Sequence, residues 1–234
     1  MTKTAAAVPN RMQALGEAKF MLAQQKLVAD YLRQGVARFR AEVFPNKREL
    51  YEQLAEKQKP EALFITCGDS RIDPSALTST EPGEIFVERT PGNIVPIYSD
   101  SAAVGVSASI EYAVVVLGVR DIIVCGHSAC GAMKGLLHRE KLAHIPATAR
   151  WLEYAEPALD LLNNSPSPHG DGARLKRLSH LNVVEQIAHL HSHPAVEARI
   201  KEGSLALHGW YYEIHTGVVE AYNEGKGQFE ELKS

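Results

Sequence analysis

The chain has 234 residues, 45% of them hydrophobic and 23% charged, a balance that is typical of a globular protein with a full core and excludes a disordered chain. Its 25 basic and 28 acidic side chains nearly cancel, so we expect a small-molecule partner and neither nucleic acid nor a membrane. Three cysteines are too few for a disulfide framework, which favours a reducing, cytoplasmic location and a chemical role for the thiols.

The N-terminal residues carry no clear targeting signal. The apolar run Ala5–Val8 is too short for a signal peptide or a membrane span. Lys3 and Arg11, with no acid among the first 16 residues, leave a short organelle transit peptide open.

The first two thirds of the chain alternate predicted helices and strands. Apolar side chains at three- and four-residue steps predict one or two helices over Met12–Phe44 and a further helix over Lys47–Glu56. A helix is also expected over Ser101–Leu117, after the turn-rich stretch Thr90–Asn93. Short apolar runs predict buried strands over Ala62–Thr66, Glu84–Glu88 and Asp121–Cys125.

The last third continues with helices and ends in strands. Residues Ala147–Pro168 are typical of a helix trailing into a loop, and Arg174–His191 of a second helix. Leu205–Tyr212 and Val218–Tyr222 alternate enough to be two strands at a sheet edge.

This order of elements predicts a single α/β domain. Its central sheet should be mainly parallel with an antiparallel edge, flanked by helices, and its ligand site should lie beyond the carboxyl ends of the strands. We expect a helical arm over residues 1–45 and one α/β domain over 46–234.

Three side chains near predicted strand ends match the ligand set of a catalytic zinc site, which takes three protein ligands and leaves a fourth position for water. His127 and Cys130 share one tight turn, and Cys67 comes from another strand end. A histidine and a cysteine three residues apart also occur by chance, and cysteine often serves as inert packing. We assign that inert role to Cys125, inside its strand.

A carboxylate and a guanidinium follow the first cysteine closely, in Cys67-Gly68-Asp69-Ser70-Arg71. An exposed salt bridge is the plain interpretation. The functional one is a bidentate pair in which Arg71 fixes the direction of Asp69, as groups beside a metal ligand often do.

At these residues the chain resembles the β-class carbonic anhydrases, which combine C-x-D-x-R with a downstream H-x-x-C. The two motifs stand here as CGDSR and HSAC, and the likeness runs from Leu50 to Tyr212, with close matches in EPGEIFVERTPGNIVP and DIIVCGHSACGAMKGLL. It is greatest to the plant-type branch, which includes bacterial enzymes linked to cyanate metabolism.

The resemblance implies reversible hydration of carbon dioxide to bicarbonate and a proton, by attack of zinc-bound hydroxide. It implies one Zn²⁺ per subunit on Cys67, His127 and Cys130, with Asp69 and Arg71 as a catalytic dyad. It further implies that the substrate pocket is lined by Gln58, Phe86, Tyr112 and Gly131.

The resemblance also implies a homodimer or a higher even homo-oligomer, because in this family the helical N-terminus wraps a partner and the pocket lies at a dimer interface. The amphipathic segment Met12–Phe44 fits this role, although its apolar stripe could equally pack on its own domain.

The sequence departs from the family at Pro91, where R-N-A-G-N or a similar run is common, and this leaves the pocket shape open. Another branch closes its site by letting the aspartate bind zinc, a state associated with an N-terminal tryptophan that this chain lacks before Trp151. We therefore expect an open site at neutral pH, with water on the zinc.

The same residues leave two other functions open: a hydrolase of carbon disulfide or carbonyl sulfide on the same scaffold, and a non-catalytic zinc module, which would usually take four protein ligands. A cysteine redox role is disfavoured because no C-x-x-C pair is present. No proton shuttle is assigned, since His189, His191 and His193 are expected at a solvated helix end.

Overall fold

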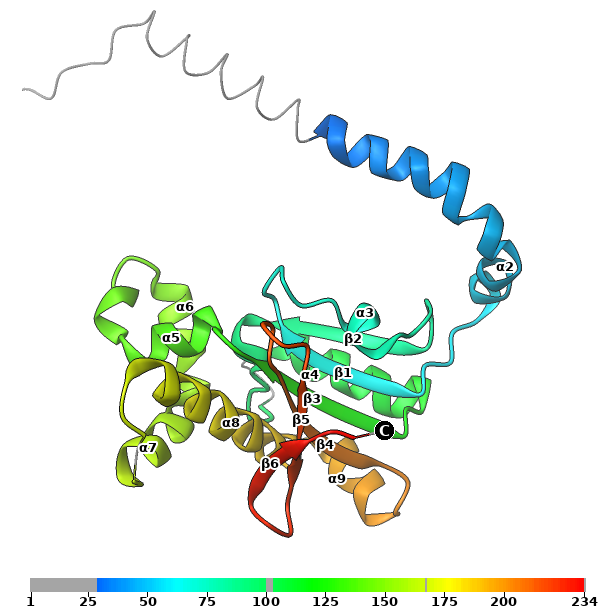
Figure 1. Cartoon of the computed structure of the whole chain (residues 1–234). Helices are drawn as coiled ribbons and strands as arrows, with labels where there is room; N and C mark the ends of the chain where they lie inside the picture. The colour runs from blue at the N-terminus through cyan, green and yellow to red at the C-terminus, as the bar shows by residue number, and fades with distance from the viewer. Residues whose placement is uncertain (1–28, 100–102, 167, 234) are drawn as a thin grey trace, which may run out of the picture. The chain divides into compact units, whose positions relative to one another are not determined.

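A computed structural model describes residues 29–99, 103–166 and 168–233, so most of the predicted N-terminal helix over Met12–Phe44 lies outside the described residues (Figure 1). The chain divides into two compact units, with the boundary in the sequence between Lys57 and Gln58. The predicted boundary of the arm at residue 45 stays a prediction. No helix in the described ranges is both long enough and apolar enough to cross a membrane.

The described part of the first unit is helical. Residues 29–38 form an α-helix, which continues through the π-helical turn η1 (Phe39–Val43) and the 3₁₀ turn η2 (Pro45–Lys47) into α2 (Arg48–Glu56). Tyr31, Leu32 and Val36 are exposed on this unit. Their spacing leaves an apolar stripe with no partner inside the described part of the unit.

The second unit is built on one six-stranded sheet with the order β2-β1-β3-β4-β5-β6. The β2, β1, β3 and β4 strands are parallel, and β5 and β6 add an antiparallel edge. A mainly parallel sheet with an antiparallel edge was predicted, but β4, which was expected at that edge, lies inside the sheet and pairs in parallel with β3. The strands are β1 (Ala62–Cys67), β2 (Ile85–Thr90), β3 (Asp121–His127), β4 (Ala206–Tyr212), β5 (Val219–Asn223) and β6 (Gln228–Glu231).

Helices connect and cover these strands (Figure 1). The α-helices of the second unit are α3 (Pro74–Thr78), α4 (Val104–Glu111), α5 (Gly131–Leu137), α6 (Pro146–Trp151), α7 (Glu156–Asn164), α8 (Asp171–Leu190) and α9 (Pro194–Lys201). The shorter 3₁₀ and π turns are η3 (Pro91–Asn93), η4 (Tyr112–Leu117), η5 (Arg139–Leu142) and η6 (Leu152–Ala155).

Three elements were not predicted: α3, α9 and β6. Helix α3 has only five residues and begins at Pro74, directly after Asp73, whose carboxylate caps it by accepting from the amides of Ser75 and Ala76. Strand β6 has four residues. Elements this short span too little of a hydrophobic period to stand out in a sequence.

The main core lies between the sheet and the helices on one of its faces. Leu63 and Ile65 of β1 and Ile122 and Val124 of β3 pack there with side chains from α4, η4, α8 and α9. The alternate side chains of these strands, with Phe64 among them, point to the other face, where α3 contributes Leu77. Burial on both faces explains why β1 and β3 appear in the sequence as continuous apolar runs.

Strands β1 and β3 lie side by side at the point where the chain reverses the direction in which it adds strands. After β1 the chain forms β2 on one side, and then β3 on the other. Both strands are parallel, so their carboxyl ends open at the same edge of the sheet. In open α/β sheets this edge is where ligands bind.

Candidate metal centre

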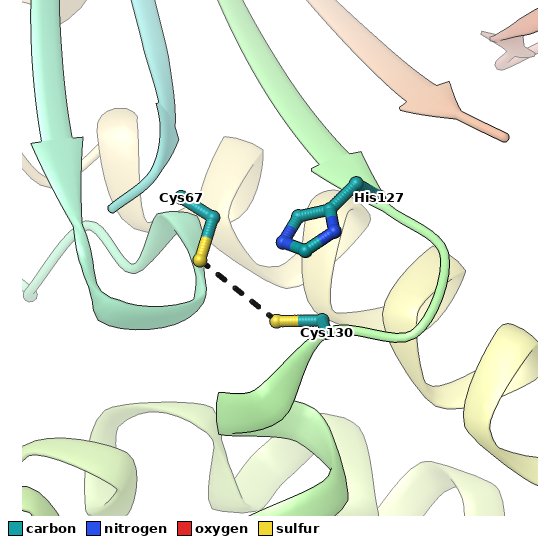
Figure 2. A group of neighbouring side chains, drawn as sticks. All are labelled: Cys67, His127 and Cys130. Carbon is teal, nitrogen blue, oxygen red and sulfur yellow. Dashed lines mark hydrogen bonds between the residues drawn. The ribbon is translucent and has the colours of Figure 1, made fainter. Parts of the chain in front are cut away.

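Three buried donors converge at this edge, from Cys67 at the end of β1, His127 at the end of β3 and Cys130 at the start of α5. Their ligand atoms all lie within 4.8 Å of one another, and the Sγ atoms of the two cysteines are 4.0 Å apart. Figure 2 shows the three side chains facing a common point. The structure thus brings together the three ligands predicted from the sequence.

The turn between His127 and Cys130 is held from both sides. Ala129 has a left-handed backbone, with φ +54°, which reverses the chain at a cost that surrounding contacts must offset. Ser128 supplies those contacts: its amide donates to the Tyr212 carbonyl at 2.9 Å, and its Oγ accepts from the Ile214 amide at 2.9 Å. Strand β4 therefore anchors the turn that presents two of the ligands.

The imidazole of His127 is oriented as a metal ligand. Its Nδ1 lies 2.9 Å from the Ser128 carbonyl, an acceptor, so Nδ1 carries the proton and Nε2 the lone pair. The Nε2 atom is buried and has no hydrogen-bond partner in the described structure. A buried acceptor without a partner is costly, and a metal ion beside the two sulfurs would satisfy it.

The two cysteines of the cluster share one proton. The hydrogen bond from Cys130 is the main reason that the pKa of Cys67 falls to about 4, while the same contact and burial raise the pKa of Cys130. A thiolate is therefore present at neutral pH. Burial instead raises the pKa of Cys125 to about 12, and this thiol lies outside the cluster, in keeping with its predicted packing role.

The predicted dyad forms beside this cluster. Arg71 donates from Nε to Asp69 Oδ1 at 2.9 Å and from Nη2 to Oδ2 at 2.7 Å, and its backbone amide donates to Oδ1 at 3.0 Å. Nη2 also reaches the carbonyl of Ala129, in the ligand turn, at 3.1 Å. These hydrogen bonds hold the pKa of Asp69 well below its usual range, so the carboxylate is ionised at every working pH.

Arg89, at the end of β2, has a structural role that the sequence did not reveal. Its Nε donates to the Cys67 carbonyl at 3.1 Å, and its Nη2 to the carbonyls of Asp69 at 2.6 Å and Ile72 at 2.9 Å. One guanidinium thus fixes the backbone of the loop that carries a metal ligand and the dyad. The only sequence signal was an arginine at a predicted strand end.

The structure does not bring three of the four predicted pocket residues to the metal centre of their own chain. Phe86 is paired with Leu63, whereas Cys67 is paired with Thr90. Phe86 therefore lies four residues, or about 13 Å, from the level of Cys67 along the strands, toward their amino ends. The rings of Phe86 and Tyr112 are 6.1 Å apart.

Gln58 is exposed and precedes β1, so it lies before the amino end of that strand, opposite the end that carries Cys67. Gly131, in contrast, follows Cys130 directly and is exposed beside the cluster, with no atom near the position of an added Cβ. Only the glycine therefore lies by the metal centre of its own chain.

The expectation of a solvated histidine group at the end of α8 was wrong for two of its members. His189 and His193 are buried, 5% and 3% exposed, and bind the carbonyls of Val95 at 2.7 Å and Pro96 at 3.0 Å. Only His191 is exposed, where it pairs with a glutamate of α9. The two-residue spacing does turn His191 away from the other two histidines. The side that carries His189 and His193 packs against a loop from elsewhere in the chain and is not solvated.

Comparison with known proteins agrees with the geometry. The carbonic anhydrase family model matches residues 62–219. A carbonic anhydrase of Pseudomonas aeruginosa is 46% identical over 198 residues, which cover 85% of this chain and 89% of that protein.

Comparison with solved structures identifies the class of carbonic anhydrase. The structure of the β-carbonic anhydrase CcaA has a TM-score of 0.85 at 39% identity, covering 88% of this chain and 92% of that chain. The Coccomyxa β-carbonic anhydrase, solved in complex with acetazolamide, has a TM-score of 0.70 at 31% identity, covering 81% of this chain and 84% of that chain. By its sequence, its sheet and its Cys-His-Cys cluster, the chain belongs to the β-class carbonic anhydrase family.

Proposed function

We propose that the chain catalyses the reversible hydration of carbon dioxide to bicarbonate and a proton, with one zinc ion per subunit on Cys67, His127 and Cys130. The convergence of these three donors at the switch point of the sheet carries the proposal. Two sulfurs and one imidazole nitrogen suit zinc, and three protein ligands leave a fourth position open. When bound, zinc lowers the pKa of a water molecule from about 15.7 to about 7, which supplies hydroxide at neutral pH.

Asp69 has one free acceptor site with which to orient the attacking oxygen. A carboxylate offers about four lone-pair sites. Oδ1 accepts from both the backbone amide and Nε of Arg71, while Oδ2 accepts only from Nη2, so one lone pair remains on Oδ2. An ionised carboxylate cannot donate, so this site can only hold the proton of the attacking group, which turns an oxygen lone pair toward the substrate carbon.

Arg71 also supports the open form of the site. Two of its hydrogen bonds to Asp69 go to Oδ1 and one goes to Oδ2, so both carboxylate oxygens are held within the dyad and Asp69 stays outside the three-residue metal cluster. Leaving the dyad would cost a bidentate, charge-assisted pair. A metal ion on the three ligands would therefore keep a fourth coordination position open to water at neutral pH.

A second copy of the chain completes the pocket in this proposal. Three pocket residues lie toward the amino ends of the strands, away from the metal ligands of their own chain: Phe86, Tyr112 and Gln58. They can therefore line a metal centre only if it belongs to another subunit. Val115 and Val116, which follow Tyr112 in η4, are 64% and 63% exposed. An exposed apolar surface next to displaced pocket residues supports a homodimer with a self-complementary interface.

The shared pocket predicts rescue between two inactive subunits. A heterodimer of Cys67→Ser with Gln58→Ala, isolated through two different affinity tags, should show about half of the native hydration rate, because it contains one native site out of two. In that site, the metal ligands come from the Gln58→Ala chain and the glutamine from the Cys67→Ser chain. Stopped-flow measurement of carbon dioxide hydration reads out the result.

The matched control pairs two changes within one metal centre. A heterodimer of Cys67→Ser with Asp69→Asn contains no native site under either arrangement and should stay inactive. If the Gln58→Ala heterodimer is as inactive as this control, the glutamine serves its own chain and the shared pocket is wrong.

Metal removal tests the proposed activity as a whole. The native chain should hold one zinc per subunit, lose hydration activity after dialysis against dipicolinate, and regain it with stoichiometric Zn²⁺ but not with Mg²⁺, which prefers oxygen ligands. Elemental analysis and stopped-flow kinetics on the same samples provide the measurement. Full zinc occupancy without hydration activity would contradict the proposed function.

A further inference from the structure

A single peptide group connects the indole of Trp151 to the sulfur of Cys67. The Gly92 amide donates to Cys67 Sγ at 3.4 Å, and the indole Nε1 of Trp151 donates to the Pro91 carbonyl at 2.8 Å. The Pro91 carbonyl and the Gly92 N–H are the two ends of the same planar peptide. The indole, the peptide and the sulfur thus form one continuous chain of hydrogen bonds.

Hydrogen bonds that are connected in series strengthen one another. A hydrogen bond received at a peptide oxygen polarises the group, and this makes its N–H a better donor. The donor here meets a sulfur of the metal cluster, and partners of a ligand atom tune both its orientation and its bond to the metal. Trp151 can therefore act on the metal centre without touching it.

The local backbone holds this peptide in place. Gly92 has a φ of +77°, and an added Cβ would lie 3.0 Å from Ala132 Cβ and 3.1 Å from Met133 Cε, so only glycine lets the turn lie against α5. Pro91 fixes its own backbone angle on the other side. The departure from the family at Pro91 removes an amide, but the donor to Cys67 is the next amide along the chain and is retained.

We propose that Trp151 is a positioning residue for the metal centre, which strengthens the hydrogen bond from the Pro91–Gly92 peptide to Cys67 through its indole N–H. This inference rests on the proposed zinc site. Trp151 ends α6, far in sequence from the ligand motifs, and packs with the apolar cluster that contains Cys67 and Cys130.

Other side chains keep the loop in place when the indole N–H is removed. Asn182 of α8 donates to the Gly92 carbonyl at 2.9 Å, and Gln186 accepts from the Val95 amide at 2.8 Å. Thr90 donates to the Ile94 carbonyl at 2.9 Å. A variant that lacks only the indole N–H should therefore change the peptide's donor strength and leave the loop folded.

The test compares Trp151→Phe with Trp210→Phe, which changes the other tryptophan, in β4 against Phe64. Each full-length protein is loaded with Co²⁺ in place of zinc, and the sulfur-to-cobalt charge-transfer absorption is recorded. Zinc affinity is measured by competition with a chromophoric chelator. Both readouts report on the metal centre independently of turnover.

Trp151→Phe should shift the charge-transfer band to longer wavelength, because a sulfur with a weaker hydrogen bond releases charge more easily. Zinc affinity should fall roughly three- to tenfold, below the 10- to 100-fold typical of direct partners of a ligand. The smaller figure is expected because a cavity of about 450 Å³ borders Pro91 and Trp151, where water can bind the freed carbonyl. Trp210→Phe should match the native protein in both readouts.

An unshifted band in Trp151→Phe overturns the inference, even if affinity falls, because a merely structural role would weaken binding without changing the sulfur. If Trp151→Phe does not fold, benzothienylalanine incorporated at residue 151 in a Trp210→Phe background keeps the ring shape and removes only the N–H. The same red shift is expected there, and its absence is equally decisive. A native chain without any sulfur-to-cobalt band would instead contradict the metal site itself.

Discussion

Cys67→Ser is expected to fold, to lose its zinc and to show no measurable hydration of carbon dioxide. A serine hydroxyl keeps nearly the same shape at the end of β1, so the strand and its pairing with β2 and β3 should remain. A neutral hydroxyl is a poor ligand for zinc, which prefers thiolate and imidazole, and His127 with Cys130 alone leaves the ion two protein donors. The effect should exceed that of any change outside the cluster.

The same substitution at Cys125 is the matched control. Cys125 lies on the same sheet and is 1% exposed, but its thiol is outside the metal cluster and points toward the carbonyl of Gly126, 3.5 Å away. A serine there can donate to the same carbonyl, so zinc content and activity should be retained. Elemental analysis after gel filtration and stopped-flow kinetics separate the two variants; a Cys67→Ser protein with native zinc content would contradict the ligand assignment.

The metal centre was predictable because its signals are local. Cys67 and His127 each end a short apolar run, and a run buried on both faces is easy to recognise in a sequence. Parallel strands then require their ends to meet at one edge, which places residues 60 positions apart beside each other. The dyad was also local, since Asp69 and Arg71 are two residues apart.

The polar face of α8 was not predictable, because its partners are distant in sequence. Asn182, Gln186 and His189 of α8, with His193 in the turn that follows, recur at steps of three and four residues, a pattern that normally indicates a solvated helix face. The structure instead places them against backbone groups between Gly92 and Pro96, about 90 residues away. No periodicity can separate a polar face that meets water from one that meets a loop.

The pocket residues show a different limit. Resemblance to the family predicted that Gln58, Phe86 and Tyr112 line the pocket, and it does not state which subunit they serve. Strand register supports the proposal that they serve another subunit, because Phe86 is level with Leu63 and not with Cys67. The predicted cytoplasmic location and the plant-type branch stay predictions.

Asp69→Asn is expected to keep its zinc and to lower kcat/KM for carbon dioxide hydration by roughly a hundredfold to ten-thousandfold, the range typical of a lost proton acceptor at a reacting group. The amide has one oxygen where the carboxylate has two. If that oxygen keeps the two bonds to the amide and Nε of Arg71, the NH₂ group takes the place of Oδ2, opposite Nη2. The one free acceptor then becomes a donor, which cannot orient the attacking oxygen.

Asp73→Asn provides the control, since it makes the same change four residues away. Asp73 caps α3 by accepting from the amides of Ser75 and Ala76, and asparagine is an equally good cap, so stability and activity should match the native protein. Because the hydrogen bonds from Arg71 hold the pKa of Asp69 well below its usual value of about 4, the native hydration rate should show no pH dependence from Asp69 at or above that value. If Asp69→Asn retains more than a tenth of the native kcat/KM with full zinc, Asp69 serves only the structure of its loop.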